Sequence, residues 1–268
     1  MVMDGTVLND EGSNNELTKL GVRRKTALPQ ESLVRIFLNG ELCSSMLCTP
    51  YDLKELSVGW LFNQGYIESV NDIAVMGACD DMRDIRIQLA NSEHRKSARE
   101  PVIKTSACMG GEISYSGFFK DIPKLSGGPI ITIAALKLLT RKTLSLADSY
   151  KATGGVHFAA IASAASKQID VFFEDVGRHT AVDKAMGRML LANQSPDDKV
   201  ILTSGRLSSE MALKAAHGKI SIIASLTTCT NLAAQIAKEA GLTVICRILK
   251  TRPIVCCGEQ RIVADDEG

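Results

Sequence analysis

One cysteine lies in a segment that has no hydrophobic pattern. Cys108 is in the stretch KTSACMGGEISYSG (residues 104–117), among glycines, serines and threonines. Because Gly110 and Gly111 leave the sulfur unshielded and the backbone free to move, we predict a mobile loop with an exposed thiol. A thiolate is reactive where it is accessible and near positive charge, which Lys104 or a basic turn elsewhere would supply. The loop therefore indicates a nucleophilic thiol, and an incidental surface cysteine fits the local pattern equally well.

Two turns that lead into helices carry the residue types of an anion site. In FFEDVGRHTAVDKAMG, Arg178 and His179 open a helix directly after two carboxylates and a glycine. In LTSGRLSSEMALKAA, Gly205 and Arg206 occupy the corresponding place. Free helix amides and arginine forks bind phosphates, and we expect the carboxylates to hold the arginine. Each turn alone also fits a capped or ion-paired helix start, whereas the two together favour a shared phosphate site. Neither matches a P-loop or a G-x-G-x-x-G fingerprint, which disfavours an ordinary nucleotide hydrolase or dehydrogenase.

The remaining cysteines do not have the spacing of a zinc site. The chain has eight cysteines but no C-x-x-C, and two of them, Cys256 and Cys257, are adjacent. We therefore expect no metal site. Four others are predicted to be small buried hydrophobic residues, because they lie among Leu, Ile, Val, Ala or Thr: Cys43, Cys79, Cys229 and Cys246.

The first half of the chain predicts a small strand-rich unit that precedes the cysteine loop. Residues 33–49 form two apolar segments around Asn39-Gly40, a strong hairpin signal. A helix is expected between Asp52 and Gly65, and two further strands follow, with the sequences IAVMGA and IRIQLA. The charged stretch 91–101 has no apolar periodicity and predicts a linker.

The second half alternates strands and helices. Helices are predicted at 130–147, 179–193, 208–218 and 230–241, and strands at 156–163, 169–177, 199–205, 220–226 and 242–249. Nearly continuous apolar strands indicate a sheet that is covered on both faces and contains parallel pairs. We therefore predict an α/β protein, α+β overall. Its divisions are an unstructured lead-in at 1–20, a smaller α+β domain at 21–104, a loop and linker at 105–128, and a larger α/β domain at 129–268.

Composition narrows the range of partners. The formal net charge is +1 over 268 residues. The overall electrostatic field therefore does not indicate binding to nucleic acid or to an anionic membrane. No apolar run approaches the 18 or so residues that span a bilayer. The N-terminal residues are polar and acidic, unlike an export signal. We expect a cytoplasmic protein whose cysteines are thiols.

Five segments, in order, resemble the FdhD family of formate dehydrogenase accessory sulfurtransferases. They are TPYDLKELSVGWLFNQGYI, the cysteine loop, TGGVHFAA, EDVGRHTAVDKAMG and TSGRLSSEMALKAA. The resemblance implies that Cys108 accepts sulfur from a cysteine desulfurase as a persulfide. It further implies that the sulfur passes to the bis-molybdopterin guanine dinucleotide form of the molybdenum cofactor, bound as transient cargo, before the cofactor enters formate dehydrogenase. No permanently bound cofactor is expected.

The resemblance also extends to the fold and to a second site. The larger domain of the family is similar to the cytidine deaminase α/β sandwich, but this sequence lacks the zinc signature H-x-E and P-C-x-x-C, so no deaminase chemistry is implied. Many members have a second loop cysteine where this chain has Gly111. A cofactor-binding segment of the family, of the form F-x-R-G-x-R, corresponds to RILKTR here, which keeps the last arginine and remains basic but lacks the Phe and the Gly. This stretch comprises Arg247, Ile248, Leu249, Lys250, Thr251 and Arg252. A homodimer is expected.

Two other functions remain open at this stage. A chaperone would hold the cofactor without handling sulfur, and it would not need Cys108. A thiol hydrolase would need His157 or His179 within hydrogen-bond reach of that sulfur.

Overall fold

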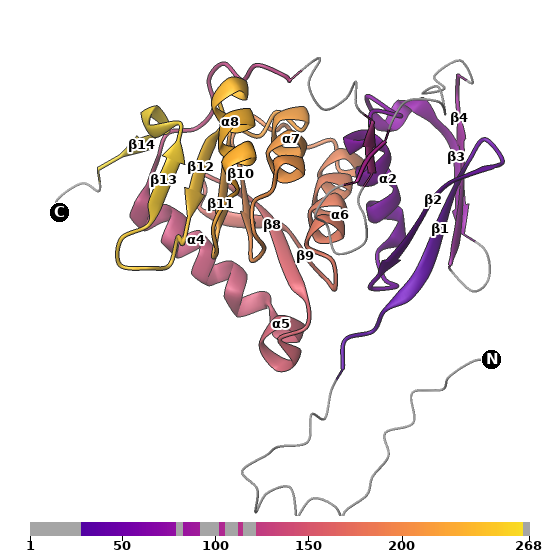
Figure 1. Ribbon diagram of the computed structural model, residues 1–268, viewed down its shortest axis with the longest axis horizontal. Coiled ribbons are helices and arrows are strands. Elements are labelled where there is room, and N and C mark those ends of the chain that lie inside the picture. The colour runs from indigo at the N-terminus through magenta and orange to yellow at the C-terminus, as the bar shows by residue number, and fades with distance from the viewer. Residues whose placement is uncertain (1–27, 79–82, 92–101, 105–111, 115–121, 265–268) are drawn as a thin grey trace, which may run out of the picture.

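The computed structural model describes residues 28–78, 83–91, 102–104, 112–114 and 122–264. The chain forms two main sheets, with α-helices between them and around the larger one (Figure 1). The predicted lead-in at 1–20 lies outside the described residues, and so does the segment 105–111 with Cys108.

The smaller sheet has four strands in the order β2-β1-β4-β3. Their bounds are β1 Ser32–Leu38, β2 Glu41–Cys48, β3 Ile73–Ala78 and β4 Asp84–Leu89. The predicted hairpin is confirmed: β1 and β2 are antiparallel, and Asn39 and Gly40 both have positive φ (51° and 88°), as a tight hairpin turn requires. A 3₁₀ turn, η1 Val70–Asp72, leads into β3.

Helix α2 (Leu53–Asn63) lies between the smaller sheet and helix α6 (Arg178–Leu191) (Figure 1). Leu53, Leu56 and Leu61 belong to the buried cluster of the smaller sheet, as the predicted helical face requires. The helix also buries Ser57 and Gly59, because α6 covers its other side. A helix enclosed on two sides does not need the single apolar stripe of a surface helix.

The larger sheet has six strands in the order β13-β12-β11-β10-β8-β9. Strands β10, β11 and β12 are parallel, whereas β8, β9 and β13 pair antiparallel with their neighbours. The bounds are β8 His157–Ser163, β9 Gln168–Asp175, β10 Lys199–Thr203, β11 Ile222–Ser225, β12 Thr243–Cys246 and β13 Ile254–Cys257. The predicted α/β architecture with parallel pairs is therefore confirmed for this half of the chain.

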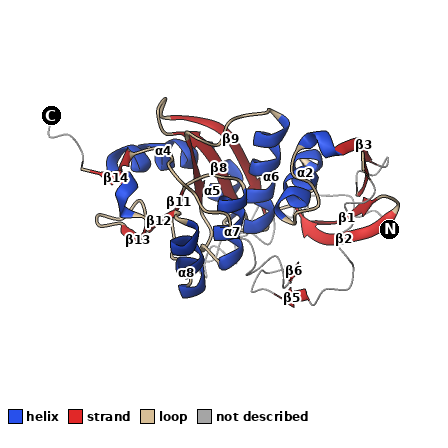
Figure 2. Cartoon of the chain, turned by 90° about the horizontal axis from the view of Figure 1, so that it is seen from above, coloured by secondary structure: helices blue, strands red, loops and turns tan. Residues whose placement is uncertain are grey.

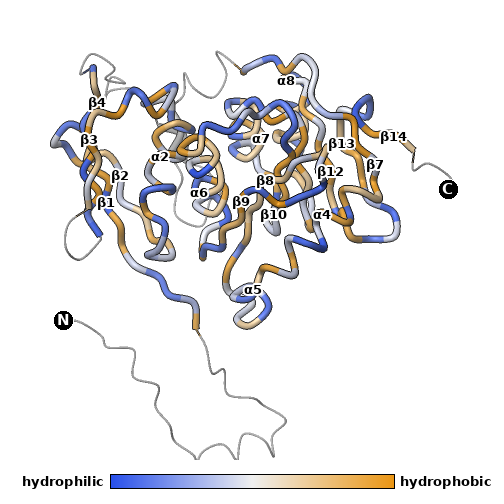
Figure 3. The backbone as a smooth tube through the Cα atoms, turned by 180° about the vertical axis from the view of Figure 1, so that it is seen from behind, coloured by the Kyte–Doolittle hydropathy of each residue, from blue (hydrophilic) through white to orange (hydrophobic). Residues whose placement is uncertain are grey.

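Helices cover both faces of this sheet (Figure 2). Along β8, Ala159 and Ile161 face the cluster formed with α6, α7 and α8, whereas Ala160 and Ala162 face the cluster on the side of α4. Alternate residues are thus buried on opposite faces, which explains the continuous apolar strands that Figure 3 shows in the hydrophobic colours. The remaining helices are α4 Ile133–Leu146, α5 Asp148–Thr153, α7 Ser209–His217 and α8 Asn231–Ala240.

Two helices meet at a seam that joins the two sheets. A Cβ atom added to Gly59 on α2 would lie 1.9 Å from the carbonyl oxygen of Asp183 on α6, and one added to Gly187 would lie 1.9 Å from that of Glu55. The two backbones therefore approach so closely that each position accepts only glycine without movement. Beside this contact, the fully buried Lys184 Nζ lies 2.7 Å from Asp175 Oδ2.

The segment between the two halves contains more order than the sequence indicates. Strands β5 (Val102–Lys104) and β6 (Glu112–Ser114) pair antiparallel, so β6 interrupts the loop predicted for 105–128. The sequence does not indicate β6, because a three-residue strand is too short to show a periodicity. The end of the predicted linker is docked as well: the Leu125 amide donates to the Ala240 carbonyl oxygen at 2.8 Å. The division into domains stays a prediction.

Several further short elements were not predicted from the sequence. They are α5, β13, β7 (Ile131–Thr132), β14 (Ile262–Val263) and the 3₁₀ turn η2 (Glu259–Arg261). Strands β7 and β14 pair in parallel across 130 residues of chain, which local patterns cannot predict. Among the described residues, no helix is long and apolar enough to cross a membrane.

Candidate functional site at one edge of the larger sheet

The turns predicted to bind anions meet at the carboxyl ends of the parallel strands of the larger sheet. We call this end of the sheet the strand-end edge. Because β10, β11 and β12 are parallel, the loops that follow them all emerge at the same edge. The Leu207 amide after β10 donates to the Thr228 carbonyl oxygen at 3.0 Å, and the Arg247 amide after β12 donates to the Thr227 carbonyl oxygen at 2.8 Å. The backbone therefore holds three loops side by side. The family segment that begins at Arg247 and the turn that carries Arg206 thus lie on either side of the loop after β11, which contacts both.

The carboxylates that precede Arg178 have other partners than the sequence analysis expected. Asp175 Oδ1 accepts from the Gly177 amide at 2.8 Å, and Asp175 Oδ2 pairs with Lys184. The Glu174 carboxylate accepts from the amides of Ser149 and Tyr150 at the start of α5. These contacts stabilise the seam and the first turn of α5, and the hold of the carboxylates on Arg178 stays a prediction.

Arg178 is a buried residue, only 5% exposed, although it was predicted to contact a ligand. Its side chain packs against Gly205, where an added Cβ would lie 2.8 Å from Arg178 Cβ and 2.9 Å from Cδ. Gly205 is thus required for close packing between the two predicted turns. The positive charge of Arg178 also lowers the pKa of the nearby His157 and His179, after the larger effect of burial.

His179 is held within the second turn. Its Nε2 atom lies 3.2 Å from Ser208 Oγ and 3.2 Å from Glu210 Oε2. Burial lowers the pKa of His179 to about 2, and the charges of Lys214 and Arg178 act in the same direction. The imidazole is therefore neutral at physiological pH, and its contact with Glu210 is a hydrogen bond between a neutral ring and a carboxyl group.

His157, at the start of β8, also contacts a serine. Its Nδ1 atom lies 3.2 Å from Ser204 Oγ, which also accepts from the Phe158 amide at 3.0 Å. Burial lowers the pKa of His157 as well, so a second neutral imidazole lies at this edge. Two serine-bound histidines were not predicted. The recurrence of Ser and His at the ends of adjacent strands was the signal available in the sequence.

The segment 247–252 is divided between core and surface. Arg247, Lys250, Thr251 and Arg252 are exposed, and Leu249 is half-buried. Ile248 is fully buried in the cluster that faces α4, and its amide donates to the Ser225 carbonyl oxygen at 3.1 Å. Arg247 has a positive φ of 53°, which turns the chain sharply after β12. Ile248 therefore anchors the loop, and a direct ligand contact by this residue is not supported.

Comparison with known proteins tests the family resemblance. The model of the FdhD/NarQ family matches residues 29–263. The chain belongs to this family. It is 31% identical over 239 residues to the sulfur carrier protein FdhD of Bacillus subtilis, with 86% of each chain covered. It is 32% identical over 199 residues to the protein of the same name from Sulfurisphaera tokodaii, with 74% of this chain and 75% of that one covered.

A solved structure extends the family relationship to three dimensions. The crystal structure of a protein proposed to be a formate dehydrogenase accessory protein, from Desulfotalea psychrophila, superposes with a TM-score of 0.71. The two chains are 28% identical, and the match covers 87% of this chain and 90% of the other. The fold of that protein is thus shared along most of this chain.

The structure brings some of the predicted site residues together, and others lie outside the described residues. The edge brings together Arg178, His179, Gly205 and Arg206, and Arg247 lies at the same edge beyond the loop after β11. Among these, Arg206 and Arg247 are exposed and available to a ligand. Cys108 and Gly111 lie outside the described residues, in the connection between β5 and β6.

Proposed function

We propose that this chain is a sulfur carrier that serves formate dehydrogenase, with Cys108 as the carrier of a persulfide. The observation that carries the proposal is membership of a family in which the relatives reported above are named sulfur carrier proteins. Cys108 is the cysteine of the loop motif that resembles the carrier loop of the family. Gly111 replaces the second cysteine of many members, and one sulfur suffices for a persulfide.

The first transfer is an exchange between sulfur atoms. The Cys108 thiolate attacks the outer sulfur of a persulfide on a cysteine desulfurase, the sulfur–sulfur bond of the donor breaks, and the donor cysteine leaves as a thiolate. The product is a Cys108 persulfide, and no net oxidation occurs. Delivery of that outer sulfur to molybdenum as a sulfido ligand requires two electrons, which we assign to two equivalents of an external thiol that leave as a disulfide, so that Cys108 returns to the thiol.

The strand-end edge is the part of the molecule that we assign to the cargo, the bis-molybdopterin guanine dinucleotide cofactor. Exposed cations at Arg206, Arg247, Lys250 and Arg252 suit its phosphates, since arginine binds phosphate through paired hydrogen bonds. The neutral histidines add hydrogen-bonding groups without further charge. The assignment of the cytoplasm as location, of a desulfurase as donor and of a homodimer as assembly belongs to this proposal as well.

The sulfur step is tested by intact mass. The full chain is incubated with a cysteine desulfurase and cysteine, and we expect the mass to rise by one sulfur atom that maps to the peptide with Cys108 and is removed by a reductant. Cys43→Ala is the matched control and should gain the same sulfur, whereas Cys108→Ala should gain none. Labelling of Cys108→Ala at the level of the unchanged chain would contradict the carrier assignment.

A second test distinguishes a sulfur carrier from a chaperone that only holds the cofactor, and it measures the restoration of formate dehydrogenase activity. If the protein only holds the cofactor, Cys108→Ala will restore activity in cells that lack the natural chain. We expect that variant to fail and Cys43→Ala to succeed.

Binding of the cargo is tested with a guanine nucleotide. The double variant Arg206→Gln/Arg252→Gln should bind GDP at least about tenfold more weakly, because each lost arginine removes a charged hydrogen bond to phosphate. A matched double variant, Lys167→Gln/Lys219→Gln, removes two exposed charges at the opposite edge of the same sheet. Equal affinities of the two double variants would remove the arginines from the proposed site.

A further inference from the structure

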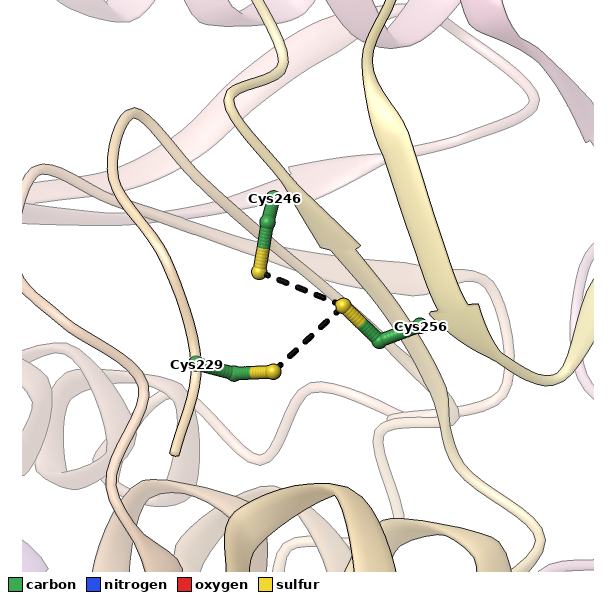
Figure 4. Close-up of side chains that lie close together, drawn as sticks. All are labelled: Cys229, Cys246 and Cys256. Carbon is green, nitrogen blue, oxygen red and sulfur yellow. Dashed lines mark hydrogen bonds between the residues drawn. The ribbon is translucent and has the colours of Figure 1, made fainter. Parts of the chain in front are cut away.

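Three cysteines from distant parts of the sequence place their sulfur atoms together (Figure 4). Cys229 Sγ lies 3.4 Å from Cys256 Sγ, which lies 3.6 Å from Cys246 Sγ. All three sulfur atoms are within 4.8 Å of one another. We call Cys229, Cys246 and Cys256 the thiol cluster. Its members are free thiols, and the cluster is separate from the proposed carrier residue Cys108.

Three elements of the larger sheet bring these thiols together. Cys246 ends β12, Cys256 lies in β13, and Cys229 lies in the loop that leads from β11 into α8. The antiparallel pairing of β12 and β13 has an irregularity between Val244 and Ile245. A bulge of this kind re-aims side chains, and here Cys256 and Cys257 both pack on the side of the sheet that Cys246 faces.

Local spacing alone predicts no zinc site. The adjacent pair Cys256-Cys257 does not have the spacing of chelating cysteines, and Cys229 was predicted to be a small buried hydrophobic residue. Cys229 is in fact half-buried, and Cys256 points to the other two thiols, whereas the Cys257 thiol donates to the Leu242 carbonyl oxygen at 3.3 Å. The fold therefore assembles a set of ligands that no motif in the sequence shows.

The separations of the sulfur atoms suit a metal. Tetrahedral zinc with Zn–S bonds of about 2.3 Å places its sulfur ligands ~3.8 Å apart, close to the separations of 3.4 and 3.6 Å here. Among the described residues, the cluster is the one group of three or more Cys, His, Asp or Glu side chains with this proximity. Because all three ligands are sulfur, the set selects a thiophilic cation over Mg²⁺ or Ca²⁺.

We propose that the thiol cluster binds one thiophilic divalent cation, Zn²⁺ being the ion to test, through three thiolates. Cys246 closes the inner side of the site, since it is 1% exposed, whereas Cys229 and Cys256 are half-buried. A fourth position therefore faces outward, where water or an exogenous ligand completes the tetrahedron. Thiols bind such a cation as thiolates, so the cation displaces their protons when it binds.

The bound ion would join the ends of strands at the edge of the proposed cargo site. Cys229 directly follows Thr228, whose carbonyl oxygen holds the turn after β10, and Arg247 directly follows Cys246. A cation on the thiol cluster would thus restrain two of the three loops at that edge. This inference does not depend on sulfur transfer by Cys108.

The test is a titration of the reduced full chain with Zn²⁺ in the absence of oxygen, in competition with a chromophoric chelator. We expect one equivalent to bind in the unchanged chain and in Cys108→Ala. Cys256→Ser should weaken that binding at least about 100-fold, because it removes the central ligand. Cys257→Ser is the matched control, a neighbouring buried thiol whose loss should leave the affinity unchanged.

A second variant keeps the test decisive if Cys256→Ser does not fold. Cys229→Ser changes a half-buried loop residue, and its helix content and melting temperature should match those of the unchanged chain. It should also lose the tight equivalent of zinc. Absence of tight binding in the unchanged chain, equal affinity in Cys229→Ser, or a disulfide between Cys229 and Cys256 in place of bound zinc would each overturn the proposal.

Discussion

The seam between α2 and α6 and the strand-end edge of the larger sheet use the same residue types in opposite ways. At the seam, Lys184 and Asp175 are completely buried against each other, and Gly59 lets two helix backbones touch. At the edge, Arg206 and Arg247 are exposed, and the glycine between the turns accommodates an arginine side chain. Charges at the seam are therefore part of the packing, whereas charges at the edge are available to a ligand.

One motif runs through both regions. In EDVGRHTAVDKAMG, the aspartates, Lys184 and Gly187 belong to the seam, and His179 belongs to the edge. Asp183, for example, binds Lys214 at 2.6 Å and Asn63 of α2 at 2.6 Å. The two regions thus share one helix, and most charged residues of the motif stabilise the fold.

The largest expected effect is loss of the buried ion pair at the seam. Lys184→Met should lower the free energy of unfolding by about 4 kcal/mol, because it leaves the Asp175 carboxylate buried without its cation. Lys124→Met is the control: its partner is Glu239 at 3.3 Å, both side chains are more than half exposed, and the cost should stay within about 1 kcal/mol. Urea unfolding of both variants measures the difference, and equal losses would contradict the distinction between buried and exposed charges.

A smaller but still large effect is expected from the close helix contact. Gly59→Ala should destabilise the chain by about 3 kcal/mol, since the new methyl group overlaps a backbone carbonyl of α6. Gly77→Ala on β3 introduces the same group where no atom lies within 4 Å and should change stability little. If thermal unfolding of the two variants coincides, the helices are able to separate and the seam is less rigid than described.

The neutral histidines predict a dependence of stability on pH. His179 has an ordinary pKa of 6.5 that falls to about 2 in the folded chain, so between these values the unfolded state binds more protons. Stability is therefore lost as the pH falls through 6.5. From about pH 7.5 to about pH 5.5, the unchanged chain should lose ~1 kcal/mol more than His179→Gln. If the free energy of unfolding depends on pH in the same way in both proteins, folding does not lower the pKa of His179.

The smallest effect on stability is expected at the edge. Arg206→Gln/Arg252→Gln should leave the free energy of unfolding within about 0.5 kcal/mol, because exposed charges contribute little to folding. The melting temperature without nucleotide measures this, and the same variant should lose the stabilisation that GDP gives to the unchanged chain. A large loss of stability without ligand would place these arginines with the structural charges of the seam.

The sequence itself determines the long elements of this protein. The Asn39-Gly40 hairpin, α2 between Asp52 and Gly65, and the alternation of strands and helices after residue 156 follow from turn chemistry and apolar periodicity, which act over a few residues. The family also follows from the sequence, because its motifs lie along the chain in a fixed order.

Only the tertiary structure decided what individual charged and sulfur-containing residues do. Arg178 and Ile248 belong to a binding motif by sequence, yet both are buried by elements that are distant along the chain. Cys229, Cys246 and Cys256 lack any recognisable spacing, yet a bulge and a neighbouring loop join their sulfur atoms. The physical reason is that burial and ligand geometry depend on which strands pair and which helices cover them, and these contacts join residues too far apart for a local pattern to record.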